Sequence, residues 1–423
     1  GTDLPRPGGE LLTGRTSSSP DGSRYDLLLS LARGGMAEVY VGQKRAAAGF
    51  TRLVAIKRAH RRIAQDASRR AEIIEEVRIA SKIHHPHLVA VHDVEELDGE
   101  LLLIMDYVEG ANVSELVVAA NRAGEPLDPA VAIRITLDCC AGLHAAHTLR
   151  DEHGQLLALI HRDVSPQNIL VGLDGLSRVT DFGIAKSKSP KRMKTTGNVL
   201  KGKVAYMAPE YVEGRSLDAR VDLFALGVVV WEMLANRRLF RGDNEPETLH
   251  RVLHDEAPRL SSQAPALPRA LDAVVAQALA KRPEERFPSA QAFADSLEAV
   301  ARMHGLIASS AAVGRPVERL VGAHLAERRA AVRQALGASG ADTPDDETTT
   351  VVMRPRAEPA ATAPPAEPEA PGGTGTAMSL ATPQTSDVDA DEQVRPAALP
   401  FMAPARSKPT PLAAVIVVLL SAG

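Results

Sequence analysis

The spacing of apolar positions predicts strands in the first part of the chain and helices in the rest. Short apolar runs with the length of strands occur at residues 27–31, 39–41, 54–57, 87–94 and 101–105. Apolar positions at helical spacing occur at residues 68–83, 128–146, 222–234, 270–279, 289–302 and 309–336.

Two of these helices also have an expected environment. Asp128 and Pro129 form a helix start, an N-cap followed by proline in the first turn. The inward stripe that follows includes Cys139, so the adjacent Cys139 and Cys140 are expected in the core rather than in a disulfide or a metal site. Two free cysteines fit a reducing compartment. Residues 222–234 are apolar nearly all round, which predicts a buried helix.

Composition limits where the folded region ends and what it binds. The net charge of the 423 residues is −4 with no strongly basic face, so we expect no nucleic-acid partner. After Phe293 the only aromatic residue is Phe401, and 13 of the 29 prolines lie within residues 338–411. We therefore expect the folded region to end near residue 335.

The last 86 residues predict a linker and an apolar end. Residues 338–411 are rich in Pro, Ala and Thr and contain 11 acidic and 5 basic residues, as disordered linkers do. Residues 412–420 are nine apolar residues, too few to span a bilayer, which needs about 20. They are either a small buried or disordered tail or the start of a truncated transmembrane helix. Arg406 and Lys408 match the cytoplasmic flank of such a helix, so we favour the second alternative.

Candidate chemistry is concentrated in a polar loop, His161-Arg162-Asp163-Val164-Ser165-Pro166-Gln167-Asn168, between two apolar runs. Asp163 suits a base near a hydroxyl, and Asn168 suits an oxygen ligand for a divalent cation. Lys57 ends the apolar strand 54–57 and needs an anion there, because an unpaired buried charge is costly. Glu76, on the predicted helix 68–83, is its candidate partner, although it could equally be one of several surface glutamates.

The loop resembles the catalytic loop of the eukaryotic-type Ser/Thr protein kinases, written HRDxxxxN. Further motifs of that family follow the same order: VAIK at residues 54–57, DFG at 181–183 and APE at 208–210. Glu76 stands nine residues before His85, as the helix-C glutamate of the family does before its HP pair. Since the resemblance covers residues 25 to about 302, the chain is identified as a bacterial Hanks-type serine/threonine protein kinase, similar to myxobacterial multidomain kinases.

The resemblance implies an α+β, bilobal protein kinase-like fold with a β-rich N-lobe and a helical C-lobe, followed by a disordered linker. The implied organisation is a flexible leader at 1–24, a kinase domain at 25–303 (N-lobe 25–105, C-lobe 111–303), a helical extension at 304–337, the linker at 338–411, and at 412–423 the start of the membrane helix.

The resemblance also implies an active site that uses ATP and Mg²⁺. Lys57, oriented by Glu76, would hold the α- and β-phosphates, and Asp163 would orient and deprotonate the substrate hydroxyl. Asn168 and Asp181 would bind the metal ions. The nucleotide would lie against Ala32, Gly34, Gly35, Ala37, Val39, Ala55, Met105, Asp106, Val108 and Leu170.

Other positions are implied to be structural or regulatory. Glu210 would pair with Arg286, and Asp222 would hold the backbone of the catalytic loop. Arg162 before the catalytic aspartate is typical of kinases activated by phosphorylation of the activation segment, and Thr195 or Thr196 is the candidate site.

Four positions depart from the family pattern. Ala32 and Ala37 replace the outer glycines of the phosphate-binding turn. We expect the turn to bind a nucleotide despite these two replacements. Ser165 stands where these kinases usually carry a lysine that touches the transferred phosphate, and Lys203 stands where they usually have a threonine. A pseudokinase or scaffold is therefore the main alternative. A dinucleotide-binding oxidoreductase is excluded, because its glycine loop should open a helix rather than join two strands.

The implied partners are protein substrates carrying Ser or Thr, and a second copy of the chain is a further candidate. Thr348, Thr349 and Thr350 in the linker are candidate sites for a phosphothreonine-binding partner. The kinase domain is expected in the cytoplasm, anchored to the inner membrane by a helix starting near Leu412. The expected role is autophosphorylation and bacterial signal transduction.

Overall fold

The computed structural model describes residues 24–34, 37–45, 51–59, 67–97, 99–157, 159–182 and 203–339. All of them belong to the first of two compact units, Gly1–Asp346, whereas the second unit, Glu347–Gly423, lies outside the described residues. The predicted leader apart from Arg24, most of the linker and the apolar C-terminal segment therefore fall outside as well. Within the part that is described, no helix combines the length and apolar character needed to cross a membrane.

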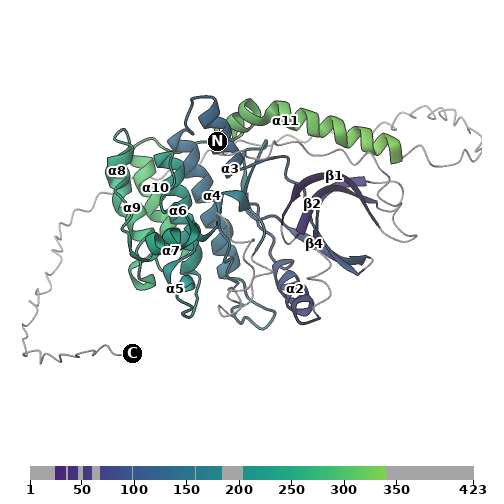
Figure 1. The fold of residues 1–423 in the computed structure, drawn as a ribbon, viewed down its shortest axis with the longest axis horizontal. Coiled ribbons are helices and arrows are strands. Elements are labelled where there is room, and N and C mark those ends of the chain that lie inside the picture. Colours follow the sequence, from purple (N-terminus) through teal and green to yellow (C-terminus); the bar gives the residue numbers. More distant parts are fainter. Residues whose placement is uncertain are drawn as a thin grey trace, which may run out of the picture. The chain divides into compact units, whose positions relative to one another are not determined.

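Five antiparallel strands form the N-lobe (Figure 1), in the spatial order β1-β2-β3-β5-β4. Their bounds are β1 (Tyr25–Arg33), β2 (Ala37–Arg45), β3 (Thr51–Ala59), β4 (Val91–Leu97) and β5 (Glu100–Asp106). The helix α2 (Ala67–Ala80), predicted at residues 68–83, lies beside the edge strand β4.

The alternation within β3 explains how this sheet presents Lys57. Val54 and Ile56 point to one face, where they are almost fully buried against Leu102 and Ile104 of β5. Lys57 therefore points to the opposite face and keeps part of its side chain exposed. The strand predicted at residues 54–57 is confirmed as the centre of β3.

The strand predicted at residues 87–94 is partly wrong, because β4 starts only at Val91. The backbone of residues 87–89 pairs instead with Val179, with 3.0 Å hydrogen bonds from Val89 N to Val179 O and from Val179 N to His87 O. This segment thus joins the N-lobe to the strand that precedes Asp181.

The C-lobe combines helices with a small sheet of three strands. The helices are α3 (Val113–Arg122), α4 (Pro129–His147), α5 (Pro209–Val212), α6 (Arg220–Ala235), α7 (Glu245–His254), α8 (Leu260–Gln263), α9 (Ala270–Ala278) and α10 (Ala290–Met303). The sheet has the order β6 (Gly110–Asn112), β7 (Ile169–Gly172) and β8 (Ser177–Val179), and the short 3₁₀ turns are η2 (Pro166–Asn168), η4 (Val204–Tyr206) and η5 (Pro283–Glu285).

Helices α4 and α6 form the centre of the C-lobe core and match their predictions. The carboxylate of Asp128 accepts a hydrogen bond from Ala130 N at 2.8 Å, which confirms the predicted N-cap of α4. Cys139 and Cys140 are free and fully buried, and burial raises the pKa of both thiols. Helix α6 is buried from Val221 to Leu234, as its all-round apolar pattern predicts.

Helix α11 (Ser310–Ser339) runs along both lobes. Val313, Val317 and Leu325 are buried in the C-lobe core, whereas Val332 is buried against Leu28 of β1. Figure 1 shows the helix passing from the side of α3 to the edge strand β1. The sequence predicts this helix at residues 309–336, but it gives no indication that the helix covers the N-lobe.

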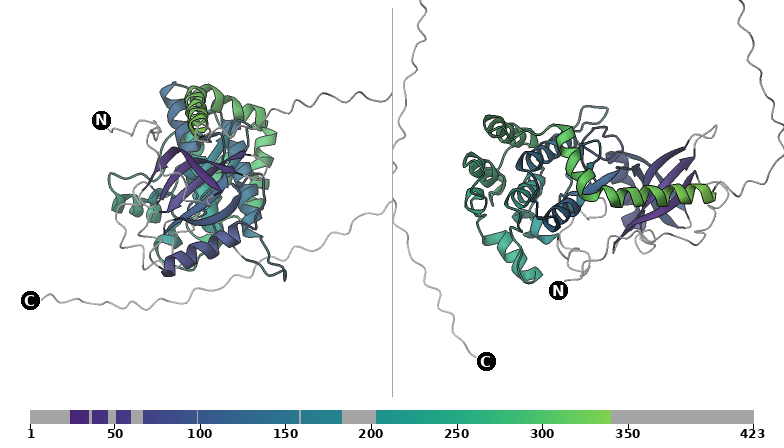
Figure 2. Two further views of the ribbon diagram at one scale, coloured as in Figure 1. Left: turned by 90° about the vertical axis from the view of Figure 1, so that its right-hand side faces the viewer. Right: turned by 90° about the horizontal axis from the view of Figure 1, so that it is seen from above.

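The start of α11 lies very close to the turn between β7 and β8. A Cβ atom on Gly175 would lie 1.8 Å from Ser310 O, and one on Gly314 would lie 2.7 Å from Leu173 O. Pro316 is inside the helix, where its missing N–H and its ring favour a bend. The view from above in Figure 2 shows α11 bent near this end.

Candidate active site

The polar loop at residues 161–168 is held by one buried carboxylate, that of Asp222 at the start of α6. Its Oδ2 accepts a hydrogen bond from His161 N and its Oδ1 accepts one from Arg162 N, both at 2.8 Å. His147 Nε2, at the end of α4, lies 2.8 Å from the same Oδ2. Burial alone would raise the pKa of Asp222, but the hydrogen bond and charge of His147 bring it below its usual value.

The carboxylate of Asp222 also supports an unusual backbone conformation. Arg162 has a φ of 62°, in the left-handed region that residues other than glycine rarely adopt. Asp181 has a φ of 59° and is the second such residue at the site. Strained backbone of this kind is concentrated at functional sites, where the surrounding contacts hold it in place.

His161 connects the polar loop to the strand end that carries Asp181. Its Nε2 lies 3.0 Å from the carbonyl oxygen of Thr180 and therefore donates, while its Nδ1 accepts from Asp163 N at 3.2 Å. The ring also lies against Phe182, with 4.7 Å between the ring centroids. Burial lowers the pKa of His161, which favours this neutral tautomer.

Asp163 and Asn168 form the polar edge of the loop. Asn168 Nδ2 donates to both the backbone O and the Oδ2 of Asp163, at 2.8 and 2.9 Å. The amide nitrogen therefore fixes the direction of the Asp163 carboxylate, and these two bonds do not use the amide oxygen, which is an acceptor. Thr180 N donates to Asn168 O at 2.9 Å, so the backbone places Asn168 beside the segment that carries Asp181.

Lys57 reaches across from β3 to this segment. Its Nζ lies 2.7 Å from Asp181 Oδ1, and the two side chains are 31% and 27% exposed. The pair is therefore accessible to a ligand. Glu76, the partner expected from the sequence, lies on α2, but its side chain is outside the described part of the structure.

The residues expected around a nucleotide surround the position of Lys57 and the connection between the lobes. Val39 is opposite Lys57 in the β2–β3 register, and Ala55 is opposite Met105 in the β3–β5 register. Gly34 N donates to Ala37 O at 3.0 Å across the turn, whereas Gly35 lies outside the described residues. Ala32, expected in this turn, belongs instead to β1 and is opposite Val39 of β2. Asp106 ends β5 and Val108 lies in the connection to β6, while Leu170 belongs to β7.

Glu210 and Arg286 are joined in the C-lobe, as expected. Arg286 Nη1 and Nη2 donate to the two oxygens of Glu210 at 2.6 and 2.7 Å, and both side chains are almost fully buried. Arg286 Nε also donates to Ala280 O at 2.8 Å. The pair fixes the segment of residues 208–210 against the rest of the C-lobe.

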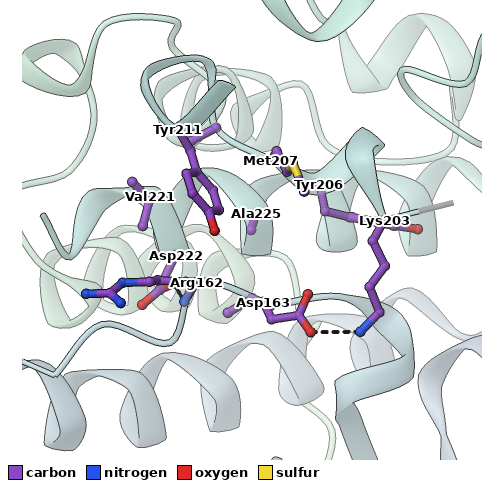
Figure 3. A pocket seen from close by; sticks show the side chains of 11 residues that line it. Arg162, Asp163, Lys203, Tyr206, Met207, Tyr211, Val221, Asp222 and Ala225 are labelled. Atoms are coloured by element: carbon purple, nitrogen blue, oxygen red, sulfur yellow. Dashed lines mark hydrogen bonds and ion pairs between the residues drawn. The ribbon is translucent and has the colours of Figure 1, made fainter. Parts of the chain in front are cut away.

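A pocket next to Asp163 lies between the polar loop and the segment that begins at Lys203 (Figure 3). Its lining combines charged and apolar side chains: Arg162, Asp163, Val164, Lys203, Tyr206, Met207, Ala208, Tyr211, Val221, Asp222 and Ala225. Lys203 Nζ donates to Asp163 Oδ2 at 2.7 Å, as the dashed line in Figure 3 marks.

Three contacts at the site and at the connection between the lobes were not predicted from the sequence. His147 contacts Asp222 across 75 positions, and none of the motifs in the sequence links these two residues. Arg329 of α11 donates to Glu109, in the connection between the lobes, and Arg328 bonds to Tyr107 there. Thr195 and Thr196, the predicted regulatory positions, lie outside the described residues.

The sequence and fold of the chain are similar to those of known protein kinases. A family model described as "Protein kinase domain" matches residues 25–297. The chain is 36% identical over 305 residues to the tyrosine-protein kinase MasK of Myxococcus xanthus, which covers 72% of this chain and 46% of MasK. It is 35% identical over 266 residues to the serine/threonine-protein kinase PknH of Mycobacterium bovis, covering 63% of this chain and 42% of PknH. The chain therefore spans less than half the length of these two relatives.

A solved structure agrees with the fold. The crystal structure of the Mycobacterium tuberculosis PknI kinase domain is 30% identical in sequence, with a TM-score of 0.51. The match covers 66% of this chain and 96% of that domain.

Proposed function

Because the chain belongs to the protein kinase family, whose model matches residues 25–297, we propose that it transfers the γ-phosphoryl group of ATP to serine or threonine hydroxyls of proteins. The observation that carries the proposal is one network of contacts around Thr180. Through the backbone of Thr180 and the ring of His161, this network joins Asp163 and Asn168 to the segment of Asp181, which Lys57 contacts directly.

We propose the following roles for these side chains. Asp163, oriented by Asn168, accepts the proton of the attacking hydroxyl, so that the oxygen can bond to phosphorus. Lys57 turns from Asp181 to the α- and β-phosphates of the nucleotide. In the free protein, Asp181 supplies the anion that a half-buried lysine requires.

The donor set also suits Mg²⁺. This ion keeps several waters and takes one or two carboxylates together with substrate phosphates. Asp181 offers a carboxylate and Asn168 an amide oxygen, in two segments that a backbone hydrogen bond joins. Bound there, the ion would neutralise charge on the phosphates during transfer.

Tyrosine is the second candidate acceptor, because MasK is named a tyrosine-protein kinase. We favour serine and threonine, since PknH and PknD are named serine/threonine-protein kinases at a similar identity of 35%. The amino-acid sequence of the loop at residues 161–168 also differs from that of the corresponding loop in tyrosine kinases.

The pseudokinase alternative and the acceptor are tested together. The purified chain is incubated with labelled ATP, Mg²⁺ and a general protein substrate, and the labelled products are hydrolysed for phosphoamino-acid analysis. We expect phosphoserine and phosphothreonine. Phosphotyrosine alone would reverse the choice of acceptor, and no labelling would favour a pseudokinase.

Asp163→Asn should lower kcat by about 10²- to 10⁴-fold, the usual contribution of a general base. Its affinity for ATP, measured by titration calorimetry, should stay close to that of the wild type, because Asp163 does not hold the nucleotide. Asp243→Asn, an exposed position away from the site, is the matched control and should keep full activity. Equal transfer by the wild type and Asp163→Asn would contradict the proposed role.

We further propose the domain organisation and regulation that the sequence predicts. The kinase domain at residues 25–303 would continue into the helical extension at 304–337, the linker and a membrane anchor from residue 412, with the kinase domain in the cytoplasm. Phosphate on Thr195 or Thr196 would order the activation segment through Arg162. Replacing both threonines by alanine should then lower activity, and unchanged autophosphorylation would count against it.

A further inference from the structure

Lys203 is fixed in the fold by the turn that follows it. Tyr206 N donates to Lys203 O at 3.1 Å, and Tyr206 itself is buried with its hydroxyl 2.7 Å from Glu232 Oε2. The Lys203 side chain, 31% exposed, extends from this anchored turn to Asp163. Its position is therefore set by the C-lobe core, although Lys203 comes 40 residues after Asp163 in the chain.

The polar loop itself brings no other cation to this side of Asp163 within the described residues. Ser165, two residues after Asp163, is buried, and its hydroxyl has no hydrogen-bond partner among the described residues. Figure 3 shows the guanidinium of Arg162 directed away from the Asp163–Lys203 pair. Among the described residues, Lys203 thus places a positive charge at the proposed base.

The chemistry of an ammonium group gives Lys203 more than one contact. It has three N–H donors, and among the described residues one of them is used, by Asp163 Oδ2. A hydroxyl that Asp163 can deprotonate must come within about 2.6–3.2 Å of its carboxylate. The reacting oxygen is then a near neighbour of Lys203 Nζ, which lies 2.7 Å from that carboxylate.

We propose that Lys203 is a catalytic residue, whose ammonium contacts the phosphoryl group as it passes to the hydroxyl oxygen that Asp163 deprotonates. The new bond joins this oxygen to phosphorus, the bond between phosphorus and the β–γ bridging oxygen breaks, and its electron pair leaves with ADP. The hydroxyl proton moves to Asp163. The ammonium group of Lys203, a fixed cation from outside the polar loop, thus stabilises the negative charge on the phosphoryl oxygens. This inference rests on the proposed function.

The alternative role for Lys203 is structural, as an ion pair that ties the segment after residue 202 to the loop. The two roles differ in what the lysine stabilises. A catalytic contact strengthens in the transition state, so its loss lowers kcat and leaves the binding of ATP unchanged. A structural pair, once broken, changes thermal stability and substrate binding instead.

The test compares Lys203→Met and Lys203→Arg in the full chain, with a peptide acceptor. Lys203→Met should lower kcat by about 10²-fold, as removal of one fixed donor to transition-state charge does, with little change in the KM for ATP or the melting temperature. Lys203→Arg keeps the charge and should retain more activity than Lys203→Met. Lys82→Met, an exposed lysine before β4, is the control and should match the wild type.

A binding measurement separates the two roles without turnover. MgADP with aluminium fluoride and the peptide imitates the transferring phosphoryl group, and Lys203→Met should bind this combination more weakly by a factor similar to its loss in kcat, while binding MgATP normally. Equal kcat in Lys203→Met and an active wild type would overturn the inference but not the proposed function. A loss confined to stability or to ATP binding would also overturn it. An inactive wild type would overturn both.

Discussion

At the residue scale, the Glu210–Arg286 pair shows how burial changes the value of an ion pair. Both side chains are almost completely removed from water, and each charge depends on the other for compensation. The Arg302–Glu298 pair on α10 has a similar distance, 2.6 Å, but its arginine is 70% exposed. Water can replace the partner in the second pair, whereas nothing replaces it in the first.

Glu210→Gln should therefore lower the free energy of unfolding by about 3–5 kcal/mol, because it leaves the Arg286 charge buried without a counter-charge. Arg302→Met should change it by less than about 1 kcal/mol, as is usual for exposed pairs. Urea denaturation followed by circular dichroism measures both. Similar losses in the two variants would show that burial does not determine the contribution of the first pair.

At the element scale, α11 is part of the folded domain although the matched family model ends at residue 297. Its first half is buried in the C-lobe core through Val313, Val317 and Leu325, and its second half covers β1 of the N-lobe through Val332. Together with the contact of Arg329 to Glu109, these contacts tie the helix to both lobes and to the connection between them. The helix therefore stabilises the pair of lobes as well as extending the C-lobe.

Leu325→Ala should lower the free energy of unfolding by about 2–5 kcal/mol, the usual range for a buried leucine that leaves a cavity. The matched control is Gln334→Ala on the exposed side of the same helix, which should have little effect. Thermal denaturation of the two variants compares them directly. If Leu325→Ala were as stable as the control, α11 would not be packed on the C-lobe in solution.

At the scale of the whole molecule, two buried groups at the polar loop make folding sensitive to acid. The folded protein lowers the pKa of His161 through burial, and it lowers that of Asp222 through its hydrogen bond and contact with His147, against the effect of burial. For both groups the unfolded chain binds protons more readily than the folded chain. Stability must then rise with pH through the range in which each group titrates.

The melting temperature should consequently be highest above pH 6.5, the ordinary pKa of histidine. It should fall as the pH decreases below this value, because His161 then takes up a proton in the unfolded chain more readily than in the folded chain. A further fall is expected below pH 3.8, where Asp222 takes up a proton in the unfolded chain. Scanning calorimetry from pH 8 to pH 5 measures the first step. His161→Gln should make this step smaller, and His153→Gln, at an exposed position, should leave it unchanged. A melting temperature that is independent of pH over this range would contradict the assignment.

The sequence predicted most elements because their patterns are local. The stripe of α4 and its Asp128 cap lie within neighbouring turns, and the apolar run of α6 shows its burial without any partner. The strand predicted at residues 87–94 was partly wrong because its first residues pair with Val179, which lies far along the chain. Pairing between distant segments leaves no mark in a local pattern.

The sequence by itself determined the family, the order of the lobes and the chemical groups available to the site, since these depend on residue types at fixed spacings. The contacts of Glu210 with Arg286 and of Asp222 with the polar loop also followed from the family motifs, but only the tertiary structure decided which other groups meet. In the folded protein, His147 contacts Asp222, and α11 extends from the C-lobe to β1. Lys203 bonds to Asp163, which lies two residues before the buried Ser165 in the chain. These contacts depend on how the packed core directs each backbone segment in space, and spacing along the chain does not record that direction.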